Sequence, residues 1–242
     1  MKKELISLVK KVRAIVMRVV KPKEGYFLFN NPKRSLKPIS TKFGFDRGKP
    51  IDRYYIESFL EENKEYIEGV CLEITDNAYT KKFGGDRVVK SDVLDIDRIN
   101  KQANIYGDLR NLKSIIAKNT YDCVILTHVL GMIDDYEAAI REVSRVLRPG
   151  GVLLFTSSCF SPTYEVESNF WRFTPASTKY VFSKYFSDAN LKVKSYGNAL
   201  AGQAFWLGFA QEELSNRELK FNDPHFPCIV AARAVKEENK NE

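Results

Sequence analysis

The chain has 242 residues, of which 44% are apolar and 29% are charged. This length and composition are those of a globular domain with its own core, and they exclude general disorder and a small disulfide scaffold. No apolar run approaches the ~18–20 residues that cross a bilayer, and no signal peptide is recognisable. The four cysteines form no C-x-x-C pair, so we expect no metal site.

The net charge of +7 is concentrated at the N-terminus. Residues 1–49 hold 14 Lys and Arg against three acids, a surplus of +11, whereas the other 193 residues hold 24 bases and 28 acids. The body of the chain therefore lacks the basic surface of a nucleic-acid-binding protein, and we expect no nucleic-acid partner.

Apolar residues recur at helical spacing over residues 4–20, with basic residues between them. The pattern predicts a basic amphipathic helix, followed by a linker up to residue 50. Such a helix can pack on its own domain, lie on an anionic membrane or bind a protein, and the sequence leaves these alternatives open. We divide the chain into this basic extension (1–49), a domain (50–236) and a charged tail (237–242). Any peripheral membrane or protein contact is expected to involve residues 1–24.

From residue 50 onward, helical and strand patterns alternate. In chain order they predict a helix at 51–66, strands at 69–74, 87–90, 104–106 and 121–127, a helix at 134–147, a strand at 152–157, a helix that Thr174 caps and Pro175 begins, a strand at 191–196, a helix at 199–214 and a last strand at 228–235. This alternation predicts an α/β fold, a mostly parallel sheet with helices on both faces.

Ligands of such sheets bind beyond the carboxyl ends of the strands, near the point where the strand order reverses. Polar side chains follow the first four predicted strands: Glu73, Thr75, Asp76 and Asn77 after the first, Asp92 after the second, Asp108 after the third, and Thr127 and His128 at the end of the fourth. An acid-lined rim suits a cationic or hydroxyl-rich ligand. Each acid taken alone is more often a loop residue or a helix cap.

Several stretches resemble the class I S-adenosylmethionine-dependent methyltransferases, over about residues 45–236. GVCLEI resembles the family's first strand, and SDVLD and GDL resemble the segments that carry its ribose-binding and adenine-binding residues. The most specific stretch is AAIREVSRVLRPGGVLLFTSS, which resembles the fourth helix, a Pro-Gly-Gly turn and the fifth strand. More narrowly, the chain resembles a bacterial subgroup commonly encoded beside glycosyltransferases, which shares DRGKPIDRYYIESFL, EITDNAYTKKFGGD and NFWRFTPAS.

The resemblance implies a Rossmann-like three-layer sandwich with a seven-stranded, mostly parallel sheet and an antiparallel last strand. It implies S-adenosylmethionine as cofactor and O-methylation of a sugar or glycan precursor, in the cytoplasm or at the inner face of the membrane. It assigns cofactor contacts to Glu73, Thr75, Asp76, Asn77, Asp92, Asp108 and Thr127, acceptor contacts to Trp171, Arg172, Arg47 and Arg53, and the role of base to His128. Local structural roles, such as loop hydrogen bonds and ion pairs, are the alternative for each.

The loop after the first strand departs from the family pattern, which is close to E-x-G-x-G-x-G. Thr75, Asn77 and Tyr79 stand where that pattern has glycines. Glycine permits a positive φ and a close approach of the backbone to a ligand. Asn tolerates the left-handed region, whereas β-branched Thr does so poorly. Either the loop takes another path that still admits the cofactor, or the chain is a non-catalytic module of the same fold.

Overall fold

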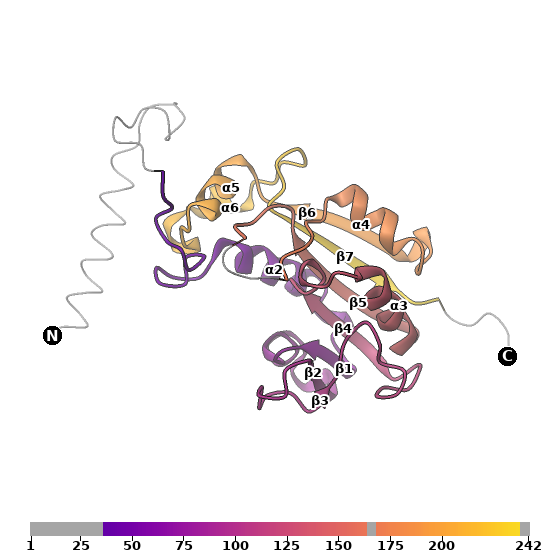
Figure 1. Ribbon diagram of the computed structural model, residues 1–242. Helices are drawn as coiled ribbons and strands as arrows, with labels where there is room; N and C mark the ends of the chain where they lie inside the picture. Colours follow the sequence, from indigo (N-terminus) through magenta and orange to yellow (C-terminus); the bar gives the residue numbers. More distant parts are fainter. Residues whose placement is uncertain (1–35, 164–167, 238–242) are drawn as a thin grey trace.

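The computed structural model describes residues 36–163 and 168–237 (Figure 1). The predicted basic helix at 4–20 and most of the charged tail lie outside these residues, so both stay predictions. No helix in the described part of the chain is long and apolar enough to cross a membrane.

Seven strands form one sheet in the order β3-β2-β1-β4-β5-β7-β6. Their bounds are Gly69–Ile74 (β1), Val88–Asp95 (β2), Ile105–Tyr106 (β3), Tyr121–Thr127 (β4), Leu147–Ser158 (β5), Leu191–Tyr196 (β6) and Ile229–Val235 (β7). The first five strands pair in parallel, and β7 runs antiparallel to both β5 and β6. The predicted sheet, mostly parallel with an antiparallel last strand, is confirmed. Its strand order reverses between β1 and β4.

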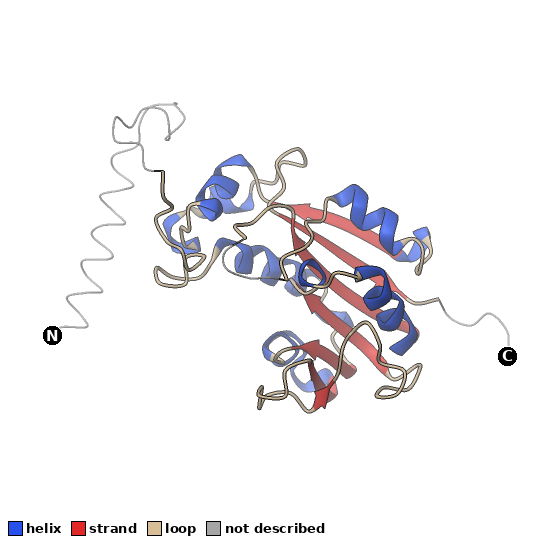
Figure 2. Cartoon of the chain, viewed as in Figure 1, coloured by secondary structure: helices blue, strands red, loops and turns tan. Residues whose placement is uncertain are grey.

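Helices cover both faces of this sheet and complete the three layers (Figure 2). On one face, α2 (Ile51–Glu62) and α5 (Ala199–Trp206) bury Ile56 and Phe205 against side chains such as Cys123. On the other, α3 (Tyr136–Val146) and α4 (Pro175–Phe182) bury Ile140 and Phe182 against the alternate residues of the same strands. Because successive side chains of a strand point to opposite faces, the uncharged run of β4 supplies both cores.

The helix boundaries follow local signals. Thr174 caps α4, with Pro175 at the first helical position as predicted, and exchanges hydrogen bonds with Ser177 in a capping box. The helix predicted at 199–214 is too long: α5 ends at Trp206, and Gly208 follows with φ at +77°. A glycine in the left-handed region is a common helix terminator. A separate short helix, α6, then spans Asn216–Lys220.

The second predicted strand is wrong in its end point, because β2 continues to Asp95. Asp92 therefore lies within the strand, only 2% exposed, rather than after it. Its carboxylate accepts hydrogen bonds from Asn104 Nδ2 (2.8 Å), Lys90 Nζ (2.9 Å) and the Tyr121 hydroxyl (3.1 Å). Burial alone would raise the pKa of Asp92, but these three donors outweigh it and hold the pKa below its usual value. They explain how a charged residue occupies a buried strand position.

Residues before α2 pack on the segment after α5. The backbone N–H of Ile39 and that of Ser40 both donate to the carbonyl of Leu207, at 2.8 and 3.2 Å. Pro50 pairs with Ala210 in an isolated antiparallel bridge. The chain thus reaches the domain body beside α5 before it enters α2.

Candidate functional site

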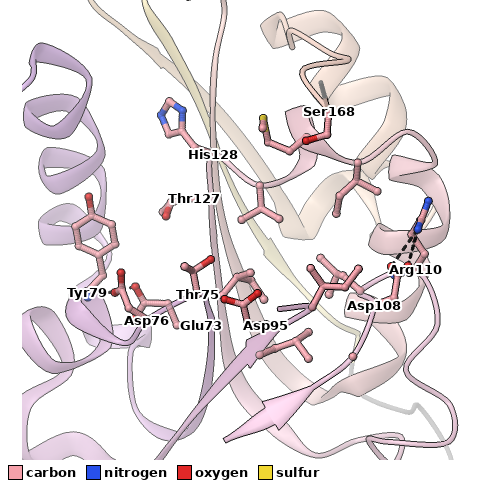
Figure 3. A pocket seen from close by; sticks show the side chains of 18 of the residues that line it. Glu73, Thr75, Asp76, Tyr79, Asp95, Asp108, Arg110, Thr127, His128 and Ser168 are labelled. Atoms are coloured by element: carbon pink, nitrogen blue, oxygen red, sulfur yellow. Dashed lines mark hydrogen bonds and ion pairs between the residues drawn. The ribbon is translucent and has the colours of Figure 1, made fainter. Parts of the chain in front are cut away.

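A cavity of about 780 Å³ opens at the carboxyl ends of β1, β2 and β4 (Figure 3). This is the edge where the strand order reverses, the place at which open α/β sheets bind ligands. Seven of the predicted residues line it: Arg53, Glu73, Thr75, Asp76, Asp108, Thr127 and His128. Asn77 and Asp92 are absent from the lining. The volume lies within the range of ~300–1,000 Å³ that small-molecule and cofactor sites occupy.

The glycine-poor loop turns at Thr75, whose φ is +74°. This residue stands at the first glycine position of the family pattern, and its backbone adopts the conformation that glycine would supply. Two hydrogen bonds fix it: its N–H donates to the Leu94 carbonyl at 2.9 Å, and its carbonyl accepts from Asn100 Nδ2 at 2.6 Å. The loop therefore makes a left-handed turn without glycine and leaves the cavity open.

Glu73 anchors the continuation of this loop. Its Oε2 accepts from the N–H and the hydroxyl of Thr80, both at 2.8 Å, and Oε1 accepts from the N–H of Tyr79 at 3.2 Å. Burial raises the pKa of Glu73 to about 7, although these hydrogen bonds oppose the shift. The side chain thus holds the loop more than it offers a free carboxylate. Asn77 has a similar part, because its Nδ2 donates to Ser91 Oγ at 3.1 Å.

Asp95, at the end of β2, lines the cavity in place of Asp92 (Figure 3). Its Oδ2 accepts from Asn100 Nδ2 at 2.6 Å, the same amide group that bonds to Thr75. Sequence reasoning missed this residue. The signal was present in the apolar pair between the two acids, Val93 and Leu94, which shows that the strand continues past Asp92.

Asp108, which follows β3, faces the other side of the cavity and is held by Arg110 (Figure 3). The guanidinium donates to both carboxylate oxygens, at 2.6 to 3.0 Å, and these hydrogen bonds lower the pKa of Asp108. Arg110 also donates to Asp134 Oδ1 at 2.5 Å. Arg110 and Asp134 line the cavity as well, and no motif in the sequence indicated either of them there.

A second, smaller cavity of about 250 Å³ adjoins the first, and both are lined by Arg53, His128 and Met132. Trp171 and Arg172, the predicted acceptor residues, line this smaller cavity. The indole Nε1 of Trp171 donates to the Asp134 carbonyl at 3.0 Å. The guanidinium of Arg172 donates to Asn169 Oδ1 at 2.6 Å, and burial lowers its pKa. The positions of both side chains are thus fixed by local contacts.

Arg47 lines neither cavity. Its guanidinium forms an ion pair with Glu213 and lies 5.7 Å from the centre of the Phe209 ring. The predicted ligand contact is therefore replaced by an ion pair that holds the segment before α2 to the segment after α5. Its partner is Glu213 and not Asp46, whose carboxylate accepts from Ser40 Oγ.

His128 lies where the two cavities meet. It is the first residue after β4 and has a φ of +58°, while its N–H still donates to the Thr156 carbonyl of β5 at 2.9 Å. Nδ1 lies 3.3 Å from Ser158 Oγ, and Nε2 lies 4.0 Å from Asp52 Oδ2. Burial lowers the pKa of His128 to about 4, so the ring is neutral near pH 7.

The chemistry of the large cavity fits a nucleoside that carries a positive charge. Its acidic side chains outnumber its basic ones, with Asp76, Asp95 and Asp134 beside those already described. Apolar Ile96 and Leu109 also line the cavity and offer apolar contacts for a base. Among residues 36–163 and 168–237, no group of three or more His, Cys, Asp or Glu side chains could hold a metal ion.

Comparison with known proteins agrees with this geometry. The family model described as a methyltransferase domain matches residues 72–155, which run from β1 into β5 and supply most of the large cavity. No curated protein matches the chain.

Solved structures of low sequence identity share the fold. A SAM-dependent methyltransferase from Archaeoglobus fulgidus is 15% identical over 76% of this chain and 94% of its own, with a TM-score of 0.53. The N-methyltransferase NodS from Bradyrhizobium japonicum, in complex with S-adenosyl-L-homocysteine, is 15% identical over 78% and 89%, with a TM-score of 0.51. The [4+2]-cyclase SpnF is 13% identical over 77% and 82%, with a TM-score of 0.52. The family match over the cavity-forming strands and the likeness to solved structures agree: residues 72–155 are similar to a methyltransferase domain, and the chain shares the fold of S-adenosylmethionine-dependent methyltransferases.

Proposed function

We propose that the chain transfers the methyl group of S-adenosylmethionine to a hydroxyl of a sugar or glycan precursor. The observation that carries this proposal is the small cavity, lined by both aromatic and polar side chains, that meets the large one at His128. The cofactor supplies a methyl group already activated by the sulfonium charge. The tasks left to the protein are to hold both molecules in line and to accept a proton, and such positioning contributes ~7–11 kcal/mol in well-oriented reactions.

In the large cavity, we assign the ribose hydroxyls to Asp95, because a carboxylate at the end of β2 can accept from two neighbouring hydroxyls. Asp108 and the apolar side chains beside it would hold the adenine. The turn at Thr75 and Asp76, together with Arg53, would hold the amino-acid part. Asp92 has no role in this assignment, since Lys90, Asn104 and Tyr121 occupy its carboxylate.

In the small cavity, the chemistry favours a carbohydrate. Aromatic rings of Trp171, Phe43 and Phe45 lie beside Arg172 and Asn169. An aromatic ring packs on the C–H face of a sugar, and a planar guanidinium donates to its hydroxyls. The resemblance to proteins encoded beside glycosyltransferases supports the same class. The missing glycines were the reason to consider a non-catalytic module. They no longer favour that alternative, because the turn at Thr75 leaves the cavity open without glycine.

We further propose that residues 1–24 bind an anionic membrane surface on the cytoplasmic side, where lipid-linked glycans are assembled. The positive surplus of residues 1–49 supports this contact. A second observation also supports it. The segment at Ile39 and Ser40 is hydrogen-bonded to Leu207, near the half-exposed rings of Trp206 and Phe226. Aromatic side chains of this kind are typical of membrane-interface contacts.

Asp95→Asn tests the ribose assignment. We expect it to weaken binding of S-adenosylhomocysteine about tenfold or more in calorimetric titration, because an amide cannot accept from both hydroxyls. Asp92→Asn is the matched control and should leave affinity within about twofold.

The Asp92→Asn variant should instead lower the free energy of unfolding at neutral pH. The depressed pKa of Asp92 stabilises the fold above the unfolded-state pKa, and this is lost as pH falls through the folded-state pKa. Loss of affinity in Asp92→Asn alone would restore the original assignment.

Thr75→Gly tests the strained turn. A left-handed Thr costs about 1–3 kcal/mol, and glycine costs about 0.5–1 kcal/mol of chain entropy, so we expect the free energy of unfolding to rise by roughly 1 kcal/mol. Urea denaturation measures it. Thr127→Gly, at the end of the neighbouring strand, relieves no positive φ and should destabilise. Equal destabilisation by both variants would show that Thr75 is not strained.

The acceptor class is tested with methyl-labelled S-adenosylmethionine and a panel of nucleotide-activated hexoses and deoxyhexoses. We expect label in at least one sugar. Trp171→Ala and Arg172→Gln should lower kcat/KM for it at least about tenfold, with affinity for S-adenosylhomocysteine unchanged. Tyr180→Ala is the control, because Tyr180 is an exposed aromatic residue that lines neither cavity. Transfer to amines or carboxylates, with none to any sugar, would overturn the proposal.

Membrane contact is tested in the full chain by the triple substitution Lys10→Glu, Lys11→Glu, Arg13→Glu. Each basic residue near an anionic surface contributes about 1 kcal/mol, so we expect co-sedimentation with phosphatidylglycerol vesicles to fall more than tenfold. Vesicles of phosphatidylcholine should bind neither protein. Unchanged sedimentation of the variant would contradict the contact.

A further inference from the structure

Three side chains from different elements form a row across the junction of the two cavities. Asp52 lies in the first turn of α2, His128 follows β4, and Ser158 ends β5. Ser158 Oγ lies 3.3 Å from His128 Nδ1, and Asp52 Oδ2 lies 4.0 Å from His128 Nε2. All three line the small cavity, and only His128 also lines the large one.

The backbone of His128 is held in an uncommon conformation that keeps the ring in this row. A φ of +58° is rare for a residue with a side chain and persists only where the surroundings enforce it. Here the hydrogen bond from its N–H to Thr156 enforces it. Such residues cluster at functional sites, and this one places an imidazole between a hydroxyl and a carboxylate.

The far nitrogen of the ring is buried but unsatisfied. Within the described part of the chain, Nε2 of His128 has no hydrogen-bond partner, and the 4.0 Å separation from Asp52 is too long for one. A buried polar atom without a partner is costly, and native structures keep one mostly where it has a use. A small rotation of either side chain would close the gap once the ring carries a charge.

We propose that Ser158, His128 and Asp52 form a proton relay that serves the acceptor hydroxyl. This inference rests on the proposed transfer to a hydroxyl. As the acceptor oxygen bonds to the methyl carbon and the sulfur–carbon bond breaks, the acceptor's proton passes to Ser158 Oγ. The proton of Ser158 passes at the same time to Nδ1 of His128. The imidazolium then donates from Nε2 to Asp52, whose carboxylate balances the new charge.

Ser158 and Asp52 thus have different parts. Ser158 is the group within the small cavity that touches the acceptor, whereas Asp52 is a positioning residue that acts through the ring. This order of hydroxyl, imidazole and carboxylate is the general way in which a neutral histidine is made an effective base. The other charged groups that act on the ring are Arg53 of α2 and Arg172 before α4, and both oppose its protonation.

The relay predicts opposite effects of two substitutions on the titration of His128. Nitrogen-15 NMR can follow it, because the chain has two histidines and exposed His225 serves as internal reference. Asp52→Asn should lower the pKa of His128 by about one unit, since it removes the attractive charge. Asn keeps the contact of residue 52 with the Arg53 N–H. Ser158→Ala should raise that pKa, because a hydroxyl that donates to Nδ1 stabilises the neutral ring.

Two further variants keep this measurement decisive. Arg172→Gln removes an opposing charge and moves the titration of His128 toward neutral pH, so the Asp52→Asn shift is measured again on that background. Glu57→Gln, on the same helix but ion-paired with Lys49 and Lys82, should leave the pKa of His128 unchanged. No shift in Asp52→Asn on either background would overturn the relay. A lowered pKa in Ser158→Ala would do the same, because the hydroxyl would then be an acceptor.

The same samples separate this inference from the proposed function. Thermal stabilisation by S-adenosylhomocysteine reports cofactor binding and should persist in Asp52→Asn and Ser158→Ala. Absence of stabilisation in the unsubstituted chain would refute the proposed function, whereas normal stabilisation without the pKa shifts would refute the relay alone. With a sugar acceptor in hand, Ser158→Ala should lower kcat about a hundredfold and leave KM unchanged.

Discussion

The large cavity depends on two residues with left-handed backbones. Thr75 follows β1 and His128 follows β4, the adjacent strands between which the sheet reverses its order. Each keeps one hydrogen bond to the strand on its outer side, Thr75 to Leu94 of β2 and His128 to Thr156 of β5. The two backbone segments therefore diverge in opposite directions at the same edge of the sheet. A parallel sheet with this strand order must open there, and the large cavity fills the opening.

Most of the fold could be predicted from the sequence, because buried parallel strands appear as short uncharged runs between helical patterns. The end of β2 could not. Asp92 is a poor strand residue, and its burial depends on hydrogen bonds from Lys90 and from Asn104 and Tyr121, which are distant in the sequence. The same holds for the candidate site. Residues at the predicted strand ends do line the cavities, but Asp95 was missed because the end of β2 was placed too early. The pairing of Arg47 with Glu213 joins segments 166 residues apart, and no local pattern reveals it.

The loss of glycine from the first loop is compensated by side chains. Glycine would give the turn at no steric cost, whereas Thr75 is held there by Asn100, whose amide group also bonds to Asp95. Glu73 ties the next residues down through Thr80. A loop of this kind is less flexible than a glycine-rich one, because each turn depends on a specific partner. The variant sequence therefore indicates a change in how the loop is stabilised, and the cavity beside it is kept.

For the proposed transfer to a hydroxyl, the distribution of charge explains why a base and its counter-charge would be needed at the junction. Acids outnumber bases among the charged residues that line the large cavity, which favours a cationic ligand. When a methyl group leaves a sulfonium for a neutral hydroxyl, the positive charge leaves with it as a proton. That proton needs a destination beside the acceptor, in a region where Arg53 and Arg172 oppose it. Asp52 is the carboxylate that faces the ring there, and in the proposed relay it would offset the two guanidinium groups when the charge arrives.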